Sequence, residues 1–339
     1  MQRSTVSLLA GAALAALAAG AAAAPKPAPY HVPRAVDGQP DLQGAWTNAS
    51  LTPLERPAAL GERAVMTPDE VAAIEGKRAA VISASNAPTK AGSDFEKQPC
   101  YAANTIDGGA TPDCGYNAFW TDHGDFVMRV NGEPRTSLIT FPANGRMPAR
   151  LPRKPGGPTP VRGVYGRAGE NPENQTLAER CITSFANHAG PVMLPSFYNS
   201  NYQIVQGRDA VAILVEMIHD VRVVKLNAQH SGVRSWYGDS IGHWDGDTLV
   251  VDSTGFNDKF WFDFAAHPHT EKLHITERYR RPDLGHLESE VTIDDPGAYT
   301  RPFTLYGHFP LQTNTEIMEY ICNENNQDVG HIVGKDSRK

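Results

Sequence analysis

The sequence predicts a mainly β protein, an antiparallel barrel or sandwich with an N-terminal extension that contains one short helix. Apolar runs with strand-like alternation recur from residue 116 onward. Turn signals such as Asn131-Gly132 and Asp245-Gly246 separate these runs. No series of helices alternates with them, which disfavours a doubly wound parallel sheet.

Residues 1–24 have the pattern of a cleaved secretory signal peptide. Arg3 precedes an unbroken run of Leu, Ala and Gly, and small residues follow as far as Pro25. The run is shorter than the ~20 apolar residues that a spanning helix needs. We therefore expect a periplasmic or secreted protein without a membrane span.

The rest of the chain divides into residues 25–115, an arm, a helix and a disulfide loop packed on the core, and residues 116–339, the antiparallel β domain. One large β domain with an extension competes with two separate domains. The net charge is −7, and Lys and Arg are scattered, so nucleic acid is not an expected partner. A small molecule is the expected partner, and the oligomeric state stays open.

The N-terminal elements have clear local signals. Residues 41–48 read as a first strand with Trp46 in the core. Thr67 and Glu70 form a capping box, and Pro68 is suited to the first helical position, so a helix should begin there. The Pro-, Gly- and Arg-rich residues 148–173 read as a long loop.

Strand pairs are expected to follow. The run 210–226 is too long for one flat strand, which predicts a bulge or bend near His219-Asp220. A tight turn at Asp245-Gly246 would place His243 opposite Thr248 and Asp239 opposite Asp252. Residues 273–281 should pair with 286–294, and residues 301–309 with 316–322.

Four cysteines in an exported chain predict disulfides. Cys100 and Cys114 bracket a Gly- and Pro-containing loop, which favours pairing them with each other. Cys181 and Cys322 then remain as the second pair.

Four titratable residues within the run 210–226 are the candidate catalytic residues. A bulge would bring His219 beside its acidic neighbours and supply a base, an orienting carboxylate and an anion-binding guanidinium. The alternative is a structural histidine with an internal ion pair, because an unpaired charge among Val, Ile and Leu is costly. The candidates are Glu216, His219, Asp220 and Arg222.

Two further groups are candidate substrate-binding residues. One lies at the entrance to a strand and offers amides and phenols that bind hydroxyls: Tyr198, Asn199, Asn201 and Tyr202. The other shares one face of the hairpin around Asp245-Gly246: Tyr237, Asp239, His243 and Asp252. That face is equally well read as a solvated polar surface.

Two motifs are weak in their context. Gly238 to Gly242 matches G-x-S-x-G, but a hairpin follows instead of the helix that a nucleophile elbow requires, so Ser240 reads as structural. His267, His269 and His274 lack an HExxH arrangement, and exposed loop histidines are the ordinary explanation. We expect no metal and no organic cofactor.

The chain resembles a family of exported bacterial proteins of uncharacterised function from about Asp41 to Asn326. The resemblance rests on DLQGAWTN, YNAFWTDHG, RTSLITFPANGR, EMIHDVR and GDSIGHWDGDTLVV. It implies that EMIHDVR and GDSIG belong to the family pattern, and it carries no residue roles. Gly44-Ala45-Trp46 is also similar to the Gly-x-Trp element of lipocalin-like proteins, which favours a barrel that holds a small ligand.

The titratable residues within strands favour an exported enzyme, a hydrolase or lyase that uses general acid/base catalysis on a small glycoside, phenolic or lactone-like molecule. The alternatives are a non-catalytic β-barrel protein that binds a small apolar or aromatic ligand, and a structural envelope protein. Convergence of the candidate residues on one site would favour the enzyme, and scattered positions would favour the binding protein.

Overall fold

The computed structural model describes residues 30–85, 122–152, 177–178, 180–184, 190–196, 199–260, 262–263, 267–322 and 324. The chain divides into two compact units, residues 1–31 and 32–339, and every element below belongs to the second. The expected signal peptide, the Cys100–Cys114 pair, most of the 148–173 loop and Tyr198 lie outside the described residues.

The fold is mainly β, as predicted. Ten strands form one curled sheet in the order β1-β5-β6-β7-β8-β9-β10-β11-β12-β4, and β2 pairs with β3 separately. The strands of the large sheet are β1 Gly44–Thr47, β4 Ile139–Phe141, β5 Asn201–Gln206, β6 Ala210–Val215, β7 Val221–Leu226, β8 Asp239–Asp245, β9 Thr248–Thr254, β10 His274–Asp283, β11 His286–Asp294 and β12 Phe303–Pro310. The small hairpin consists of β2 Arg129–Val130 and β3 Glu133–Pro134.

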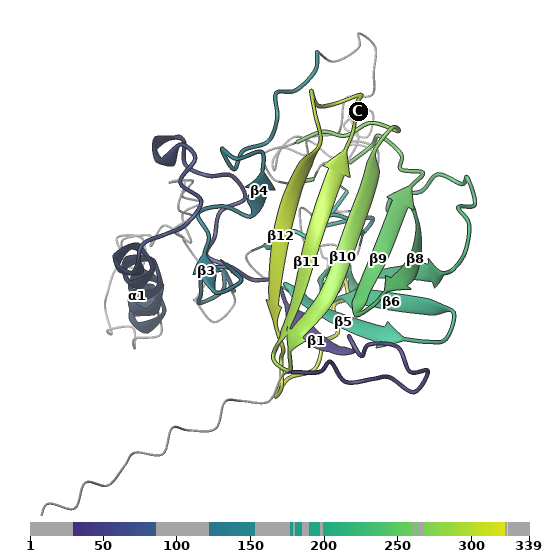
Figure 1. Ribbon diagram of the computed structural model, residues 1–339, viewed down its shortest axis with the longest axis horizontal. Coiled ribbons are helices and arrows are strands. Elements are labelled where there is room, and N and C mark those ends of the chain that lie inside the picture. Colours follow the sequence, from purple (N-terminus) through teal and green to yellow (C-terminus); the bar gives the residue numbers. More distant parts are fainter. Residues whose placement is uncertain are drawn as a thin grey trace, which may run out of the picture. The chain divides into compact units, whose positions relative to one another are not determined.

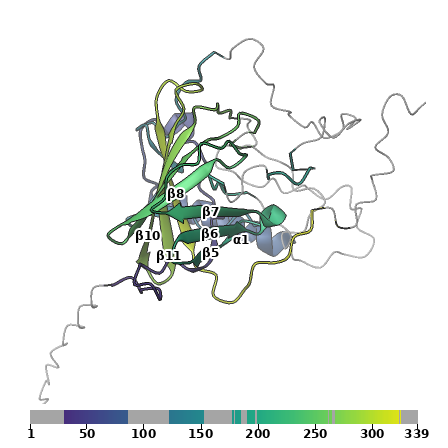
Figure 2. The ribbon, with the colours of Figure 1, turned by 90° about the vertical axis from the view of Figure 1, so that its right-hand side faces the viewer.

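The large sheet bends sharply between β7 and β8. Strands β8 to β12 lie side by side, and β5, β6 and β7 run across them (Figures 1 and 2). Only two residue pairs, Lys225 with Ile241 and Leu226 with Gly242, join β7 to β8, in parallel. A Cβ on Gly242 would lie 2.9 Å from Val224 Cγ1, so glycine permits this close approach.

The sheet meets itself on its other side. Trp46 of β1 forms an antiparallel bridge with Leu311, just after β12. The N–H of Gln312 donates to the carbonyl of Ala45 at 2.7 Å. The result is a barrel-like sheet in which the half formed by β1, β5, β6 and β7 faces the half formed by β8 to β12.

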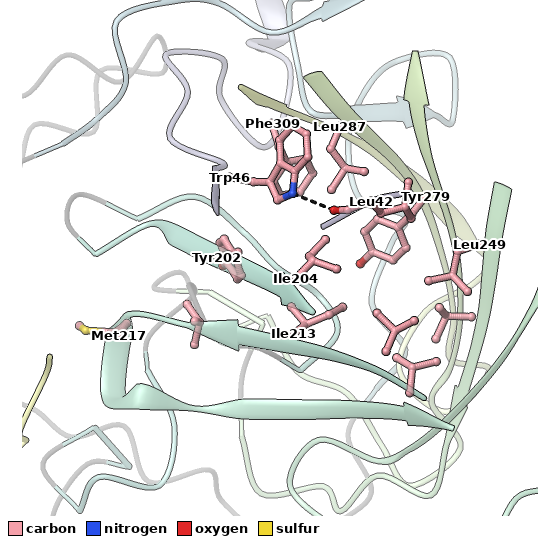
Figure 3. Packing of buried hydrophobic residues seen from close by; sticks show 14 of the residues in the cluster. Leu42, Trp46, Tyr202, Ile204, Ile213, Met217, Leu249, Tyr279, Leu287 and Phe309 are labelled. Atoms are coloured by element: carbon pink, nitrogen blue, oxygen red, sulfur yellow. Dashed lines mark hydrogen bonds between the residues drawn. The ribbon is translucent and has the colours of Figure 1, made fainter. Parts of the chain in front are cut away.

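The space between the two halves is filled by apolar side chains (Figure 3). Trp46 is fully buried, as predicted, and its Nε1 donates to the carbonyl of Leu42 at 3.0 Å. The guanidinium of Arg281 lies 5.1 Å from the centre of the Trp46 ring. Burial of each large side chain here contributes on the order of 2–3 kcal/mol. The cluster also includes Tyr202, Ile204, Val211, Ile213, Val215, Val224, Leu249, Val251, Tyr279, Leu287 and Phe309.

Helix α1 spans Pro68–Ser85 and begins where the sequence predicts. The capping box is formed: Thr67 N–H donates to the Glu70 carboxylate at 2.8 Å, and Glu70 N–H donates to Thr67 Oγ1 at 3.2 Å. Two short 3₁₀ helices, η1 Ala58–Leu60 and η5 Met217–His219, are also present. None of the helices in the described part of the chain is long and apolar enough to cross a membrane.

Three expectations about the strands need correction. Residues 210–226 form two antiparallel strands, β6 and β7, so the predicted bend is a full reversal of the chain. Residues 316–322 form no strand, and β12 pairs with β11 and β4 instead. In the β8–β9 hairpin Asp245 pairs with Thr248, so the two turn residues are Gly246 and Asp247.

A buried ion pair joins the two halves of the sheet. Arg222 of β7 donates from Nη1 to Glu277 Oε2 at 2.6 Å and from Nη2 to Glu277 Oε1 at 3.1 Å. Tyr279 Oη donates to Glu277 Oε1 at 2.5 Å. The side chains of Arg222 and Glu277 are 3% and 0% exposed, so each charge is stabilised in the interior by the other.

Breaking this pair should destabilise the protein strongly. Arg222→Met leaves the Glu277 carboxylate buried without its partner, and we expect a loss of about 3–5 kcal/mol in the free energy of unfolding. Denaturant unfolding at pH 7 measures the change. The double variant Arg222→Met/Glu277→Leu should recover much of it, because no buried charge remains.

The matched control is Arg34→Met. Arg34 pairs with Asp247 at the surface, so its loss should cost less than about 1 kcal/mol. An Arg222→Met variant as stable as this control would contradict a stabilising role for the buried pair.

Candidate functional site

The turn between β6 and β7 carries unusual backbone conformations. Ile218 and His219 have φ of 62° and 47°, in the left-handed region that a β-branched residue such as Ile rarely adopts. Asn199 and Cys181 also have positive φ, and both segments are tied to this end of the barrel. Such residues gather where function constrains the chain, so this turn is a candidate site.

Glu216 lies at the start of the turn and is 2% exposed. Its Oε1 accepts from Asn199 Nδ2 at 2.7 Å, and its Oε2 accepts from Asn201 Nδ2 at 3.2 Å and from Met318 N–H at 3.2 Å. The structure therefore brings together one predicted catalytic residue and two predicted substrate-binding residues. They bind one another and hold the C-terminal segment against the turn.

His219 is exposed at the tip of the turn. Its Nδ1 lies 2.8 Å from the carbonyl oxygen of Tyr320. A carbonyl only accepts, so Nδ1 carries the proton and Nε2 keeps its lone pair when the ring is neutral. This arrangement orients the ring as a base.

Asp220 follows directly and lies beside two phenols. Burial raises the pKa of Tyr237, and the Asp220 carboxylate raises it further. The Tyr237 hydroxyl donates to the carbonyl of Ile182 at 2.9 Å. Burial also raises the pKa of the fully buried Tyr202, and Asp220 adds to that effect. Both phenols therefore stay protonated beside a carboxylate.

Arg222 points into the core from the same hairpin, and both of its terminal nitrogens are bound to Glu277 or Tyr279. The predicted anion-binding fork is thus occupied by a protein carboxylate. Glu277 and Tyr279 did not enter the candidate set, although the apolar alternation of β10 places both with Ile275 on the buried face.

Three residues of the second predicted group, Asp239, His243 and Asp252, lie on the outer face of the sheet, whereas Tyr237 lies beside Asp220 and does not share that face as predicted. Asp239 faces Thr254, not Asp252, because the turn is displaced by one residue. Lys225 Nζ lies 2.6 Å from Asp239 Oδ1. Burial tends to raise the pKa of Asp239, but the hydrogen bonds from Lys225 and from the Ser231 N–H outweigh it and lower the pKa to about 2.

Asp252 on the same outer face holds two imidazoles. His230 Nε2 lies 2.7 Å from its Oδ1, and His274 Nε2 lies 2.6 Å from its Oδ2. Burial tends to raise the pKa of Asp252, and the two histidines outweigh it. His243 is exposed on this face. Asp239, His243 and Asp252 are therefore separated by the sheet from the β6–β7 turn.

The two weak motifs have structural explanations. Ser240 is buried on β8 and shares a hydrogen bond of 2.8 Å with Ser253 Oγ. His267 Nδ1 binds Asp263 Oδ2 at 2.6 Å, while His269 is 4% exposed and packs against aromatic rings. Within the described ranges no group of three or more His, Cys, Asp or Glu side chains could hold a metal ion. The rings around His269 belong to Phe256, Phe260 and Phe262.

The second predicted disulfide is present. Cys181 and Cys322 are bonded across a sequence separation of 141 residues. The bond anchors the C-terminal segment near Tyr320, whose carbonyl binds His219.

No protein-family model matches the chain, and no curated protein matches it. A solved structure of a mutant of the fluorescent protein UnaG is similar over 33% of this chain and 71% of that chain, at 14% identity and a TM-score of 0.22. A likeness this low carries no functional argument.

The buried ring of His269 predicts that the stability of the protein depends on pH. Burial lowers the pKa of His269 to about 4, against a reference of about 6.5 in the unfolded chain. The stabilising contribution of the neutral ring is complete above pH 6.5 and is lost as the pH falls toward 4, by up to about 3 kcal/mol. His269→Leu should lose this part of the pH dependence, measured by denaturant unfolding between pH 7 and pH 4.

His243→Leu, a change at an exposed histidine, is the control and should unfold with the pH dependence of the wild type. If the free energy of unfolding of His269→Leu fell with decreasing pH as steeply as that of the wild type, His269 would not be a buried neutral ring.

Proposed function

We propose that the protein is an exported enzyme, a hydrolase or lyase that uses general acid/base catalysis on a small glycoside, phenolic or lactone-like molecule. One observation carries the proposal: His219 is exposed, its tautomer is set by the Tyr320 carbonyl so that Nε2 keeps its lone pair, and Asp220 is the next residue in the chain. An oriented base next to a carboxylate is suited to proton transfer.

The roles follow from the hydrogen bonds. His219 Nε2 takes a proton from the substrate or from an attacking water. The protonated His219 then gives this proton to the leaving group. The Tyr237 hydroxyl stays protonated, donates to the Ile182 carbonyl at 2.9 Å and acts as a positioning group beside Asp220. Asp220 orients this phenol and stabilises the imidazolium that forms when His219 is protonated. Glu216, Asn199 and Asn201 act as positioning residues, because their polar atoms hold the turn itself.

The proposed location is the periplasm or the cell exterior. Support comes from the signal-like residues 1–24 and from the Cys181–Cys322 bond, since disulfides persist in oxidising compartments.

The second candidate function is non-catalytic binding of a small apolar or aromatic ligand at the same end of the barrel. The candidate residues do not converge on one site, because Asp239, His243 and Asp252 lie across the sheet from the β6–β7 turn, and this separation favours the binding protein. The partly exposed ring of Tyr237 near the turn favours it too, because aromatic side chains supply large apolar contact area. In this case the Tyr237 ring matters for affinity and His219 does not.

The test is turnover of aryl glycosides, aryl esters and lactones by the purified mature chain. His219→Ala should lower kcat about 100-fold or more, since a positioned acid/base group contributes about 10²–10⁴. Asp220→Asn and Tyr237→Phe should also lower kcat. Melting temperatures should stay within a few degrees of the wild type, because His219 is exposed.

His243→Ala is the matched control, as an exposed histidine on the opposite face, and should keep full activity. An equal loss of kcat in His219→Ala and His243→Ala would refute the catalytic assignment. So would the absence of turnover of every substrate class by the wild type. Ligand binding that survives His219→Ala and is weakened by Tyr237→Phe would support the binding protein instead.

A further inference from the structure

The C-terminal segment, residues 313–322, contributes little packing of its own. Within this range, all of which the structure describes, the chain forms no helix and no strand. Met318 and Ile321 are 64% and 51% exposed, while the Tyr320 ring packs against the apolar cluster around Trp46. Ordering such a segment costs conformational entropy that few contacts offset. Its position therefore depends on how its far end is attached.

Two hydrogen bonds of the segment end on the turn between β6 and β7. Met318 N–H donates to the Glu216 carboxylate at 3.2 Å, and the Tyr320 carbonyl accepts from His219 Nδ1 at 2.8 Å. Figure 2 shows the residues after β12 in yellow as they pass toward this turn. The disulfide of Cys322 follows directly, so that bond decides whether the Tyr320 carbonyl stays against His219.

The other end of the disulfide is held independently of the bond. Cys181 N–H donates to the carbonyl of Ala178 at 3.0 Å. The carbonyl of the next residue, Ile182, accepts from the Tyr237 hydroxyl at 2.9 Å. Opening the disulfide would therefore leave the Cys181 side in place and free the C-terminal side.

The bond is open to chemistry, because Cys181 and Cys322 are both partly exposed. A thiolate of a dithiol attacks one of the two sulfurs and forms a mixed disulfide, and its second thiolate then displaces that sulfur. Two electrons and two protons pass from the dithiol to the protein. The dithiol ends as a disulfide, and the two cysteines end as thiols.

We propose that the Cys181–Cys322 bond is a redox latch that controls the tautomer of His219. With the latch closed, the Tyr320 carbonyl holds the ring proton on Nδ1. With the latch opened by a dithiol, this acceptor leaves, and the neutral ring is free to carry its proton on Nε2. Loss of the base at Nε2 rests on the proposed function, whereas release of the segment does not.

The first test is amide hydrogen exchange, followed by NMR, in the mature chain before and after treatment with dithiothreitol. The Met318 amide should exchange about tenfold faster or more after reduction, because it loses Glu216 as its acceptor. The Gln312 amide is the internal control. It donates to the Ala45 carbonyl before the segment begins, and its exchange rate should not change.

The second measurement is nitrogen NMR of the histidine rings at a pH where they are neutral, with the His219 signals assigned by their loss in His219→Gln. In the oxidised protein Nε2 of His219 should give the signal of an unprotonated nitrogen. After reduction this signal should shift toward that of a protonated nitrogen.

The double variant Cys181→Ala/Cys322→Ala is the matched control. It should show the fast Met318 exchange and the altered His219 signal without a reductant, and dithiothreitol should not change either. Reduction of the wild type requires no substitution, so it decides the question if the double variant does not fold.

Unchanged Met318 exchange after reduction, or a bond that dithiothreitol does not open in the folded protein, would overturn the proposal. So would an unchanged His219 tautomer, a simultaneous loss of protection at Gln312, or a response to dithiothreitol that persists in a folded double variant. None of these measurements requires turnover, so failure of the latch and failure of the proposed enzyme activity are distinguishable.

Discussion

The Arg222–Glu277 ion pair is the constraint on which the arrangement of the two halves depends. It joins β7 to β10 across an apolar interior, and the Tyr279 hydroxyl adds one hydrogen bond to each charged group. Each charge would be costly to bury alone, so, with both groups present, the two halves must hold them in register. Trp46, Tyr202 and Phe309 are large buried side chains of the same apolar cluster as Tyr279.

The same constraint positions the candidate site. Because Arg222 points inward from β7, the preceding turn must bring His219 and Asp220 to the end of the barrel. Glu216 fixes the other side of that turn through Asn199 and Asn201. In this short segment Arg222 therefore stabilises the interior and Glu216 holds the turn. His219 and Asp220 remain near the surface.

The C-terminal segment completes this end of the molecule. Met318 N–H binds Glu216, the Tyr320 carbonyl binds His219, and Cys322 is bonded to Cys181. These three contacts lie within five residues, so the disulfide holds in place the carbonyl that sets the histidine tautomer. A segment that pairs with no strand therefore contributes directly to the proposed chemistry.

The sequence by itself determined the local features: the β class, the capping box that starts α1 at Pro68, the burial of Trp46 and the two faces of the β8–β9 hairpin. Each depends on neighbouring residues, whose periodicity and turn chemistry are readable. It also singled out Glu216, His219, Asp220 and Arg222 from their unusual place among apolar residues. Only the tertiary structure decided their partners, because Glu277, Tyr320 and Asn199 come from distant segments, and contacts between distant strands leave no periodic signal along the chain.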